Sequence, residues 1–325
     1  MHKNKDHPEK PNLHPRNRNR ERYDLDAMAK TTPELSRYIQ PNKRGTPSIN
    51  FSDSKAVRLL NKSILHHYYD IAFWDFPDEN LTPPIPGRAE YIHRVADLLS
   101  ESNNSNVPTG ANVRSLDIGT GASCIYPIIG IVEYDWNFIG IDIDAAAIAS
   151  AQRIVESNPS LQGKIDLRLQ KHDSSIFRGV VHADDKIDII ICNPPFHSSA
   201  EEALKGSRRK VRNLTGQKQQ APNLNHAGIQ NELIYQGGEV QFIKNMISES
   251  KEYASSCLWF SALVSKESHL YKIKDELDQW KPSDIRTLPI RTGNKMSRIV
   301  AWTYHSSDDR ARWFQSKNGA SGEVS

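Results

Sequence analysis

The run Val113-Arg114-Ser115-Leu116-Asp117-Ile118-Gly119-Thr120-Gly121 is typical of a short buried strand that ends in a glycine turn. The two glycines allow a ligand to approach the backbone closely, because neither carries a side chain. A dinucleotide-binding fingerprint would place a third glycine at position 124, but this chain has Cys124 there. It also has an acid, Asp117, before the first glycine. The alternative is that Gly119 and Gly121 serve only a strand-turn-helix corner.

The Asp-x-Gly-x-Gly pattern of residues 117–121 resembles the cofactor loop of S-adenosylmethionine-dependent methyltransferases. In that loop the acid helps to hold the methionine end of the cofactor. A second strand is expected at 137–144, about 20 residues beyond the glycines, where Rossmann-like folds place an acid on ribose hydroxyls. We expect Asp142 to bind the ribose, because it lies at the end of this strand. Asp144 is better placed to cap the helix that follows.

A third strand, expected at 187–192, runs directly into Asn193-Pro194-Pro195-Phe196. This motif suits methylation of the exocyclic amine of adenine, a poor nucleophile that two hydrogen-bond acceptors can orient. The side chain of Asn193 can be one acceptor and the carbonyl of Pro194 the other, with Pro195 fixing the direction of that carbonyl. Phe196 can then stack on the base, and Asn193 can also contact the cofactor. The alternative is that Asn-Pro-Pro merely ends a strand.

The order of these motifs places all three at the carboxyl edge of one parallel sheet, where ligands of open α/β sheets bind. Further strands are expected at 165–169, 257–264, 284–289 and 299–304, and helices at 239–252 and 268–280. The expected fold class is α/β: a Rossmann-like class I methyltransferase with a mostly parallel, seven-stranded sheet and helices on both faces. After strand 165–169, His172 and Asp173 can reach the adenine end of the cofactor.

Basic residues are unevenly distributed, although the net charge of +3 and the pI of about 8.6 argue only weakly for a nucleic-acid partner. One basic run contains Arg16, Arg18, Arg20 and Arg22. A second lies in a long acid-free loop after the Asn-Pro-Pro-Phe motif and includes Arg208, Arg209, Lys210 and Arg212. A solvated tail is the usual explanation of a charge run, but a second run beside the site favours contacts with RNA phosphates.

The chain of 325 residues is expected to contain four segments. They are a basic, partly disordered RNA-binding arm at 1–45, a small helical subdomain at 46–101, a methyltransferase domain at 102–305 with a basic insertion at 197–238, and a tail at 306–325. Helices are expected at 53–69 and 88–99 within the second segment. Arg88 lies at the start of the later helix, where it can pair with the methionine carboxylate. A surface arginine is the alternative.

Other features narrow the class of protein. The three cysteines are far apart and lack metal-ligand spacing, so we expect reduced core thiols and no metal site. No apolar run approaches the roughly 18 residues that a membrane-spanning helix needs, and the N-terminus lacks a secretory apolar core. A cytoplasmic, soluble protein is therefore expected.

Several blocks resemble the RlmF-type family of 23S rRNA adenine-N6 methyltransferases. They are His14-Pro15-Arg16-Asn17-Arg18, Ser48-Ile49-Asn50-Phe51, residues 88–93, residues 116–126, residues 192–196 and Gly237-Gly238-Glu239. The resemblance implies S-adenosylmethionine as cofactor, the N6 amine of a specific adenine in 23S rRNA or a large-subunit assembly intermediate as target, and an N-terminal arm that binds RNA. It also implies that Arg88 touches the cofactor.

Two other functions stay open at this point. Protein glutamine N5-methyltransferases also use an Asn-Pro-Pro motif, to orient a planar amide nitrogen, but the two basic runs argue against a protein substrate. The second alternative is a non-catalytic RNA-binding or ribosome-assembly protein with a degenerate methyltransferase fold. The presence of Asp117, Gly119, Gly121, Asp142 and Asn193 argues against degeneration.

Overall fold

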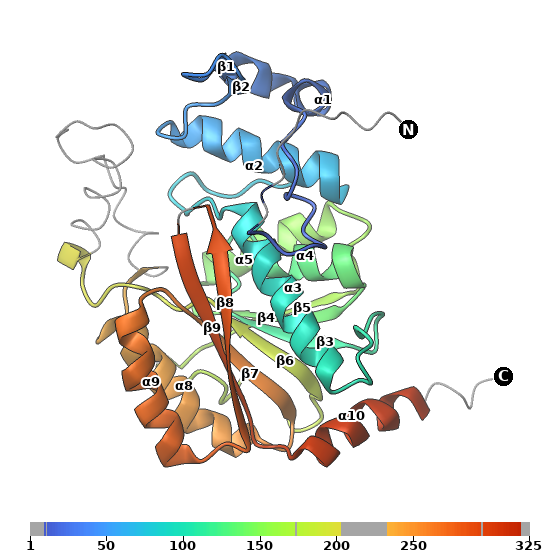
Figure 1. The fold of residues 1–325 in the computed structure, drawn as a ribbon, viewed down its shortest axis with the longest axis vertical. Coiled ribbons are helices and arrows are strands. Elements are labelled where there is room, and N and C mark those ends of the chain that lie inside the picture. The colour runs from blue at the N-terminus through green and yellow to red at the C-terminus, as the bar shows by residue number, and fades with distance from the viewer. Residues whose placement is uncertain (1–9, 11, 173, 203–232, 294, 320–325) are drawn as a thin grey trace.

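The computed structural model describes residues 10, 12–172, 174–202, 233–293 and 295–319 (Figure 1). Its main sheet has seven strands in the order β5-β4-β3-β6-β7-β9-β8. Their bounds are Arg114–Ile118 (β3), Asn137–Asp142 (β4), Ile165–Leu169 (β5), Ile187–Cys192 (β6), Cys257–Val264 (β7), Asp284–Thr292 (β8) and Lys295–Thr303 (β9). The first five run parallel, and β9 pairs antiparallel with β7 and β8. The expected mostly parallel α/β fold is confirmed.

The centre of the sheet follows from its apolar sequence. All six residues of β6 are buried, because helices cover both faces of a parallel sheet. The neighbouring strand β3 keeps only its first residue, Arg114, exposed. Ile118 at the end of β3 lies opposite Ile141 of β4 and Cys192 of β6. The residues that follow these three strands therefore leave the sheet at the same edge.

Helices form two layers on the sheet. The helices of the described residues are Leu25–Thr31 (α1), Ser54–Tyr69 (α2), Ile85–Glu101 (α3), Ile125–Tyr134 (α4), Ala145–Glu156 (α5), Gly238–Ser250 (α8), Glu267–Trp280 (α9) and Ser307–Gly319 (α10). Buried residues of α3, α4 and α5 share one core with α2. Those of α8 and α9 form a second core on the opposite face (Figure 1). No helix within the described ranges is long and apolar enough to cross a membrane.

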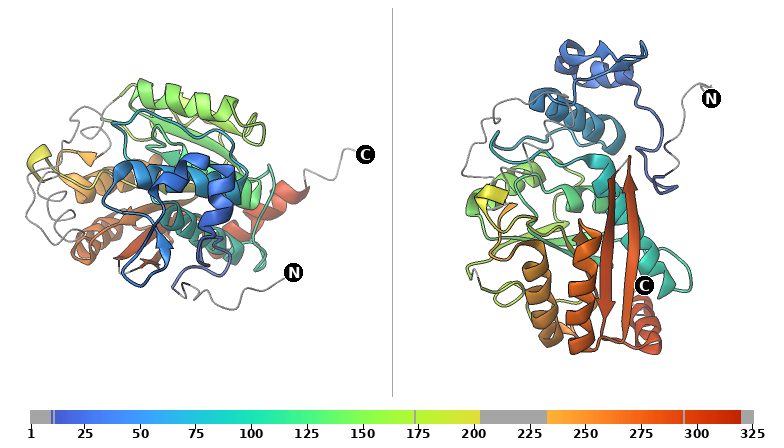
Figure 2. Two further views of the ribbon diagram at one scale, coloured as in Figure 1. Left: turned by 90° about the horizontal axis from the view of Figure 1, so that it is seen from above. Right: turned by 60° about the vertical axis from the view of Figure 1, so that its left-hand side comes forward.

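The N-terminal elements form a cap at one end of the molecule (Figures 1 and 2). The cap contains α1, a 3₁₀ helix at Pro33–Tyr38, the two short strands Gln40–Pro41 (β1) and Pro47–Ser48 (β2), and α2. Helix α3 packs on the sheet, although it lies within the range 46–101 expected as a subdomain. It begins at Ile85, three residues earlier than expected, because proline is well tolerated in the first turn of a helix.

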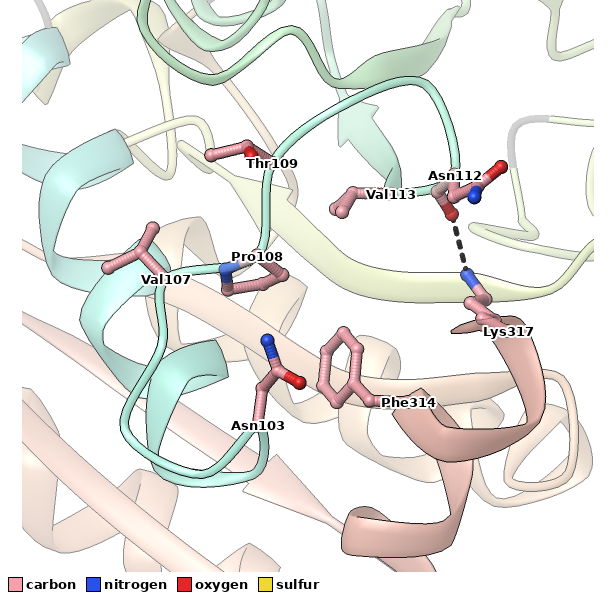
Figure 3. Close-up of a pocket in the computed structure, with 8 residues that line it drawn as sticks. All are labelled: Asn103, Val107, Pro108, Thr109, Asn112, Val113, Phe314 and Lys317. Atoms are coloured by element: carbon pink, nitrogen blue, oxygen red, sulfur yellow. Dashed lines mark hydrogen bonds between the residues drawn. The ribbon is translucent and has the colours of Figure 1, made fainter. Parts of the chain in front are cut away.

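The C-terminal helix α10 docks at the amino edge of the sheet. Lys317 Nζ contacts both carboxylate oxygens of Asp188 at 2.8 and 2.6 Å, and Trp313 Nε1 donates to the same carboxylate at 2.7 Å. A shallow cavity of about 210 Å³ lies beside this contact (Figure 3). It is lined by Asn103, Val107, Pro108, Thr109, Asn112, Val113, Phe314 and Lys317. Because Val113 precedes β3, the cavity lies at the edge opposite the glycine loop and Asn193.

Candidate active site

Four elements meet at the carboxyl edge of the sheet. They are the loop after β3, the end of β4, the Asn-Pro-Pro-Phe segment after β6, and the first turns of α3. The parallel register brings the first three together, since Ile118 lies opposite both Ile141 and Cys192. The sequence motifs that were expected to share an edge therefore do share it.

The glycine loop has the backbone geometry that its sequence requires. Gly119 has φ +70° and Gly121 has φ +67°, values that favour glycine over any residue with a side chain. The amides of Gly119 and Thr120 both donate to the carbonyl of Ile141 at 2.9 Å, so the loop is tied to β4. A Cβ atom at Gly119 would meet nothing within 4 Å. The glycines therefore form a turn whose outer side is open to a ligand.

The two acids after β4 have different surroundings. Asp142 accepts a hydrogen bond from the Gly121 amide at 2.9 Å and another from the Asp144 amide at 3.0 Å. Burial raises the pKa of Asp142 above its ordinary value. Asp144 instead caps α5, because its carboxylate accepts from the Ala146 amide at 2.8 Å. The expectation that Asp144 caps the helix is confirmed, and Asp142 lies beside the glycine loop.

Several buried polar atoms at this edge of the sheet lack a hydrogen-bond partner in the part of the chain that the structure describes. Within the described residues, both carboxylate oxygens of Asp117, Nε of Arg88 and Oδ1 of Asn193 are buried and make no hydrogen bond. Asp117 is fully buried, and burial raises its pKa to about 8. Unpaired buried groups are costly, so several of them at one sheet edge call for a ligand that completes their bonding.

The unpaired atoms fit the amino-acid end of S-adenosylmethionine. Its ammonium would complement the Asp117 carboxylate, and its carboxylate would complement the Arg88 guanidinium. Arg88 is already oriented by α4, since its Nη1 donates to the Tyr126 hydroxyl at 2.8 Å and its guanidinium lies 5.2 Å from the centre of that ring. The contact with Tyr126 fixes the orientation of the guanidinium, so Arg88 is not a freely moving surface arginine.

The Asn-Pro-Pro-Phe segment becomes more exposed after Pro194. Pro194 is buried, whereas Asn193, Pro195 and Phe196 are partly exposed. Oδ1 of Asn193, which the sequence predicted to be an acceptor, is buried and bonds to no described residue. An amide that merely ended the strand would be expected to bond to the adjacent backbone.

Tyr91 of α3 supports this segment from behind and was not identified from the sequence. Its hydroxyl lies 3.3 Å from the carbonyl of Cys192, 3.4 Å from the Cys192 amide and 3.1 Å from Oγ of Ser261. Ser261 in turn donates to the Ile190 carbonyl at 2.6 Å. The only sequence signal was a tyrosine on the apolar side of a helix, which does not reveal a partner 101 residues away.

The residues that follow the insertion pack beside the end of the Asn-Pro-Pro-Phe segment. The His197 amide donates to the carbonyl of Leu233 at 2.9 Å, and the Tyr235 amide donates to the carbonyl of His197 at 3.0 Å. Gly238 has φ +67°, and a Cβ atom there would lie 3.4 Å from the Ser198 amide nitrogen. The buried Glu239 accepts from the Ser265 amide at 2.8 Å and lies 2.5 Å from Nδ1 of His269. The Gly-Gly-Glu block thus fixes the exit of Asn-Pro-Pro-Phe.

The residues expected at the adenine end are only partly placed. His172 is exposed after β5, and its amide donates to Oε1 of Gln170 at 2.9 Å. Asp173 lies outside the described residues.

The basic run at residues 14–22, which is part of the arm expected at 1–45, contacts helices α3 and α4. Its binding to RNA stays a prediction. Arg16 pairs with Asp97 at 2.6 Å and donates to the Tyr134 hydroxyl at 2.8 Å. Arg18 pairs with Glu133 at 2.9 Å. Both side chains keep about two fifths of their surface exposed, at 39% and 41%.

The remaining basic residues predicted to contact RNA fall into two groups. Arg20 and Arg22 are partly buried. Arg208, Arg209, Lys210 and Arg212 lie outside the described residues, as do residues 1–9.

Known proteins resemble this chain along nearly its whole length. The model of an RNA methyltransferase family matches residues 7–306. A protein named ribosomal RNA large subunit methyltransferase F from Cytophaga hutchinsonii is 49% identical over 314 residues, which cover 96% of this chain and 98% of that protein. A protein of the same name from Photobacterium profundum is 46% identical over 327 aligned positions, covering 96% and 97%.

Two solved structures share the fold. The catalytic domain of hMettl16 in complex with a MAT2A 3′UTR hairpin has a TM-score of 0.76 and 29% identity, covering 91% of this chain and 96% of that one. The N-terminal domain of human METTL16 in complex with SAH has a TM-score of 0.71 and 27% identity, covering 90% and 99%. The family match spans most of the chain, and the relatives exceed two fifths identity along nearly their whole lengths. The chain therefore belongs to the RNA methyltransferase family, together with the proteins named ribosomal RNA large subunit methyltransferase F.

Proposed function

We propose that this protein transfers a methyl group from S-adenosylmethionine to the N6 amine of a specific adenine in 23S rRNA. The observation that carries the proposal is the buried, unpaired Oδ1 of Asn193 at the same sheet edge as the unpaired carboxylate of Asp117. One atom is a hydrogen-bond acceptor for a substrate, and the other is an acceptor for the cofactor.

Each group of the cofactor is bound by a different residue. Asp117 accepts from the ammonium group, Arg88 pairs with the carboxylate, and Asp142 accepts from the ribose hydroxyls. Gly119 and Gly121 leave room for the chain between these groups. The names of the relatives and the S-adenosylhomocysteine complex of a structural neighbour support this choice of cofactor.

His172 and Asp173 are the candidates for the adenine end, because they follow β5 at the same edge of the sheet. Asn193 borders both the cofactor and the substrate, since it follows β6 directly.

Methyl transfer needs an amine whose lone pair is aimed at the donor. The bound cofactor would supply an electrophilic methyl group and leave as S-adenosylhomocysteine, and the methylated nitrogen would lose one proton to water. Asn193 Oδ1 and the Pro194 carbonyl accept hydrogen bonds from the two N–H bonds of adenine N6, which draws its lone pair out of conjugation with the ring. Pro195 fixes the extended backbone that directs the Pro194 carbonyl. Phe196, which is partly exposed, stacks on the flipped base.

RNA contacts are proposed for two basic groups. Arg16, Arg18, Arg20 and Arg22 lie near the start of the chain, and Arg208, Arg209, Lys210 and Arg212 lie in the insertion. The ion pairs of Arg16 with Asp97 on α3 and of Arg18 with Glu133 on α4 leave part of each arginine side chain exposed to a phosphate. The substrate is 23S rRNA or a large-subunit assembly intermediate, as the names of the relatives suggest.

The test is methyl transfer in vitro together with mapping in cells. Purified protein is incubated with tritium-labelled S-adenosylmethionine and either 23S rRNA or total protein, and rRNA from a strain that lacks the gene is mapped by mass spectrometry. We expect label in rRNA and the loss of one N6-methyladenine in the deletion strain. Label in protein alone would favour glutamine methylation, and cofactor binding without transfer to either substrate would favour a non-catalytic role.

A further inference from the structure

The start of α3 is held by hydrogen bonds from residues outside that helix. Asn17 Nδ2 donates to the carbonyl of Pro86 at 3.1 Å and to Oε2 of Glu90 at 3.2 Å. The backbone amide of His14 donates to the same Glu90 oxygen at 2.7 Å. From α2, Oδ1 of Asn61 accepts from the Ile85 amide at 3.2 Å. The start of α3 is therefore fixed from two directions.

These contacts are buried, which makes them geometrically demanding. Glu90 is fully buried, and Asn17 is only 2% exposed. The other carboxylate oxygen of Glu90 accepts from Arg94, at 3.2 Å from Nε and 3.1 Å from Nη2. A buried carboxylate must have its acceptor sites filled, so losing one donor is costly and the arrangement has few alternatives. Asn17 and Glu90 thus set the position of the helix start.

Arg88 lies between the two anchored residues of α3, Pro86 and Glu90. Its guanidinium faces Tyr126 of α4 and has one buried nitrogen, Nε, without a partner among the described residues. The guanidinium hydrogen-bonds to the Tyr126 hydroxyl, whereas Asn17 hydrogen-bonds to the Pro86 carbonyl and to Glu90. A rotation or shift of the first helical turn would therefore move Arg88 relative to the glycine loop.

We propose that Asn17 and Glu90 are positioning residues for the cofactor site, acting through Arg88. The inference rests on the proposed pairing of Arg88 with the methionine carboxylate. On this proposal, the residues of the His-Pro-Arg-Asn-Arg block have two different roles. His14 and Asn17 face inward and fix α3, whereas Arg16 and Arg18 remain half-exposed at the surface. The block that the sequence suggested as an RNA contact is therefore also part of the support for the cofactor.

The experiment compares two ligands on the full-length protein. S-adenosylhomocysteine carries the amino-acid carboxylate, and 5′-methylthioadenosine lacks it. For Asn17→Ala we expect calorimetry to show S-adenosylhomocysteine binding weakened about five- to tenfold, the equivalent of one lost orienting contact. Binding of 5′-methylthioadenosine should stay within about twofold of wild type, because it does not engage Arg88. Glu90→Gln should show the same selective loss.

A matched control separates positioning from general loss of stability. Asn158 is also a buried asparagine, and its Nδ2 donates to the carbonyls of Phe73 and Ile154, each at 2.7 Å, away from α3. Asn158→Ala should lower the melting temperature as Asn17→Ala does, but should leave the affinities for both ligands unchanged. Equal weakening of both ligands by Asn17→Ala would show a purely structural role and overturn the inference.

Arg88→Ala completes the test. It should weaken S-adenosylhomocysteine selectively, and adding Asn17→Ala to Arg88→Ala should weaken it no further. If Arg88→Ala is selective but Asn17→Ala has no effect, the positioning role is wrong while the role of Arg88 stands. If Arg88→Ala leaves S-adenosylhomocysteine affinity unchanged, the proposed carboxylate contact is wrong, and the positioning role is overturned with it.

Discussion

The backbone amide of Gly121 donates to Oδ2 of Asp142 at 2.9 Å, which joins the glycine loop to the acid at the end of β4. Oδ1 of the same carboxylate accepts from the Asp144 amide at 3.0 Å. Each oxygen has a second lone pair, so the carboxylate can serve the protein and a ligand together. The loop and the proposed ribose acceptor therefore form one preformed unit.

Asp142→Ala should weaken S-adenosylhomocysteine binding, because the ribose hydroxyls lose a charged acceptor and the loop loses its anchor. The expected loss is about 1.5–3 kcal/mol, as for a hydrogen bond to a charged group. Isothermal titration calorimetry measures it directly. Asp144→Ala is the control, since it removes the cap of α5 and should lower stability by about 1 kcal/mol with little effect on affinity. Equal affinities in wild type and Asp142→Ala would remove Asp142 from the cofactor site.

Asp117 should release a proton when the cofactor binds. Burial raises its pKa to about 8, so at pH 7 the carboxyl is mostly protonated in the cofactor-free protein. An incoming ammonium group favours the ionised form, which predicts release of up to about one proton per ligand at pH 7 and tighter binding as the pH rises toward 8. Calorimetry in two buffers with different ionisation enthalpies measures the release. Buffer-independent heats in the wild type would contradict this prediction.

The same group should affect the stability of the cofactor-free protein. Between the ordinary pKa of 3.8 and the folded-state value of about 8, the folded protein holds a proton that the unfolded chain has lost. Stability contributed by this group is therefore greatest below the lower value and falls as the pH rises through the higher one. Asp117→Asn should unfold with a flatter pH dependence across this window. A variant that follows the wild-type slope would show that Asp117 is ionised in the folded protein.

Lys317→Ala should destabilise the fold without changing the site. Asp188 is fully buried and bonds to Lys317, Trp313 and the Arg114 amide, so the substitution removes one of its three partners. We expect a loss of about 1–3 kcal/mol in the free energy of unfolding, measured with urea. Arg312→Ala on the same helix, where the side chain is 71% exposed, should change it by less than about 0.5 kcal/mol. A large drop in cofactor affinity would be unexpected, because α10 docks at the other edge of the sheet.

The basic insertion should set the salt dependence of RNA binding. Each phosphate contact contributes roughly 0.7–0.9 units to the slope of log affinity against log salt, so replacing Arg208, Arg209, Lys210 and Arg212 by Ala should reduce it by up to about three units. Lys272 and Lys274, which are exposed on α9, provide a control substitution with smaller expected effect. Fluorescence titration of an rRNA fragment at several salt concentrations measures the slope. The same slope in the insertion variant and the wild type would show that these residues do not contact phosphates.

The sheet and its motifs could be predicted from the sequence because their signals are local. Strand β6 is an apolar run interrupted only by Asp188, and the glycine loop is a strand-turn unit within nine residues of chain, from 113 to 121. Parallel strands then bring the motifs to one edge without further information. The cap formed by Asp144 could also be anticipated, since a helix start and its capping residue are adjacent in sequence.

Long-range polar partners could not be predicted. Charge at positions 16 and 18 indicates exposure but does not reveal Asp97 or Glu133 as partners. The contact between Asn17 and the carbonyl of Pro86 joins residues 69 positions apart, and no periodicity in the sequence indicates it. Helix α10 was also missed, because its docking depends on the single buried carboxylate of Asp188 in a strand that reads as apolar.

Asn193 best separates two hypotheses: that its side chain accepts a hydrogen bond from the substrate amine, and that it merely ends β6. Asn193→Ala removes the side-chain acceptor but leaves the Pro194 carbonyl and the Phe196 ring. The fold should survive, because no described residue bonds to the buried Oδ1. Cofactor affinity should stay near wild type, because Arg88, Asp117 and Asp142 remain. Phe196→Ala is the companion variant. It should raise the RNA concentration needed for half-maximal transfer, since stacking on the base, worth about 1–3 kcal/mol, is lost in the bound state as well.

Single-turnover methyl transfer to 23S rRNA by Asn193→Ala, with saturating RNA and cofactor, tests the proposed mechanism most directly. Thermal melting and S-adenosylhomocysteine affinity of the same preparation confirm that the protein is folded. We predict a rate reduced by about a hundredfold or more, with both of those properties near wild type. A wild-type rate, or a loss of rate that only accompanies unfolding, would show that Asn193 merely ends β6 and would contradict the account.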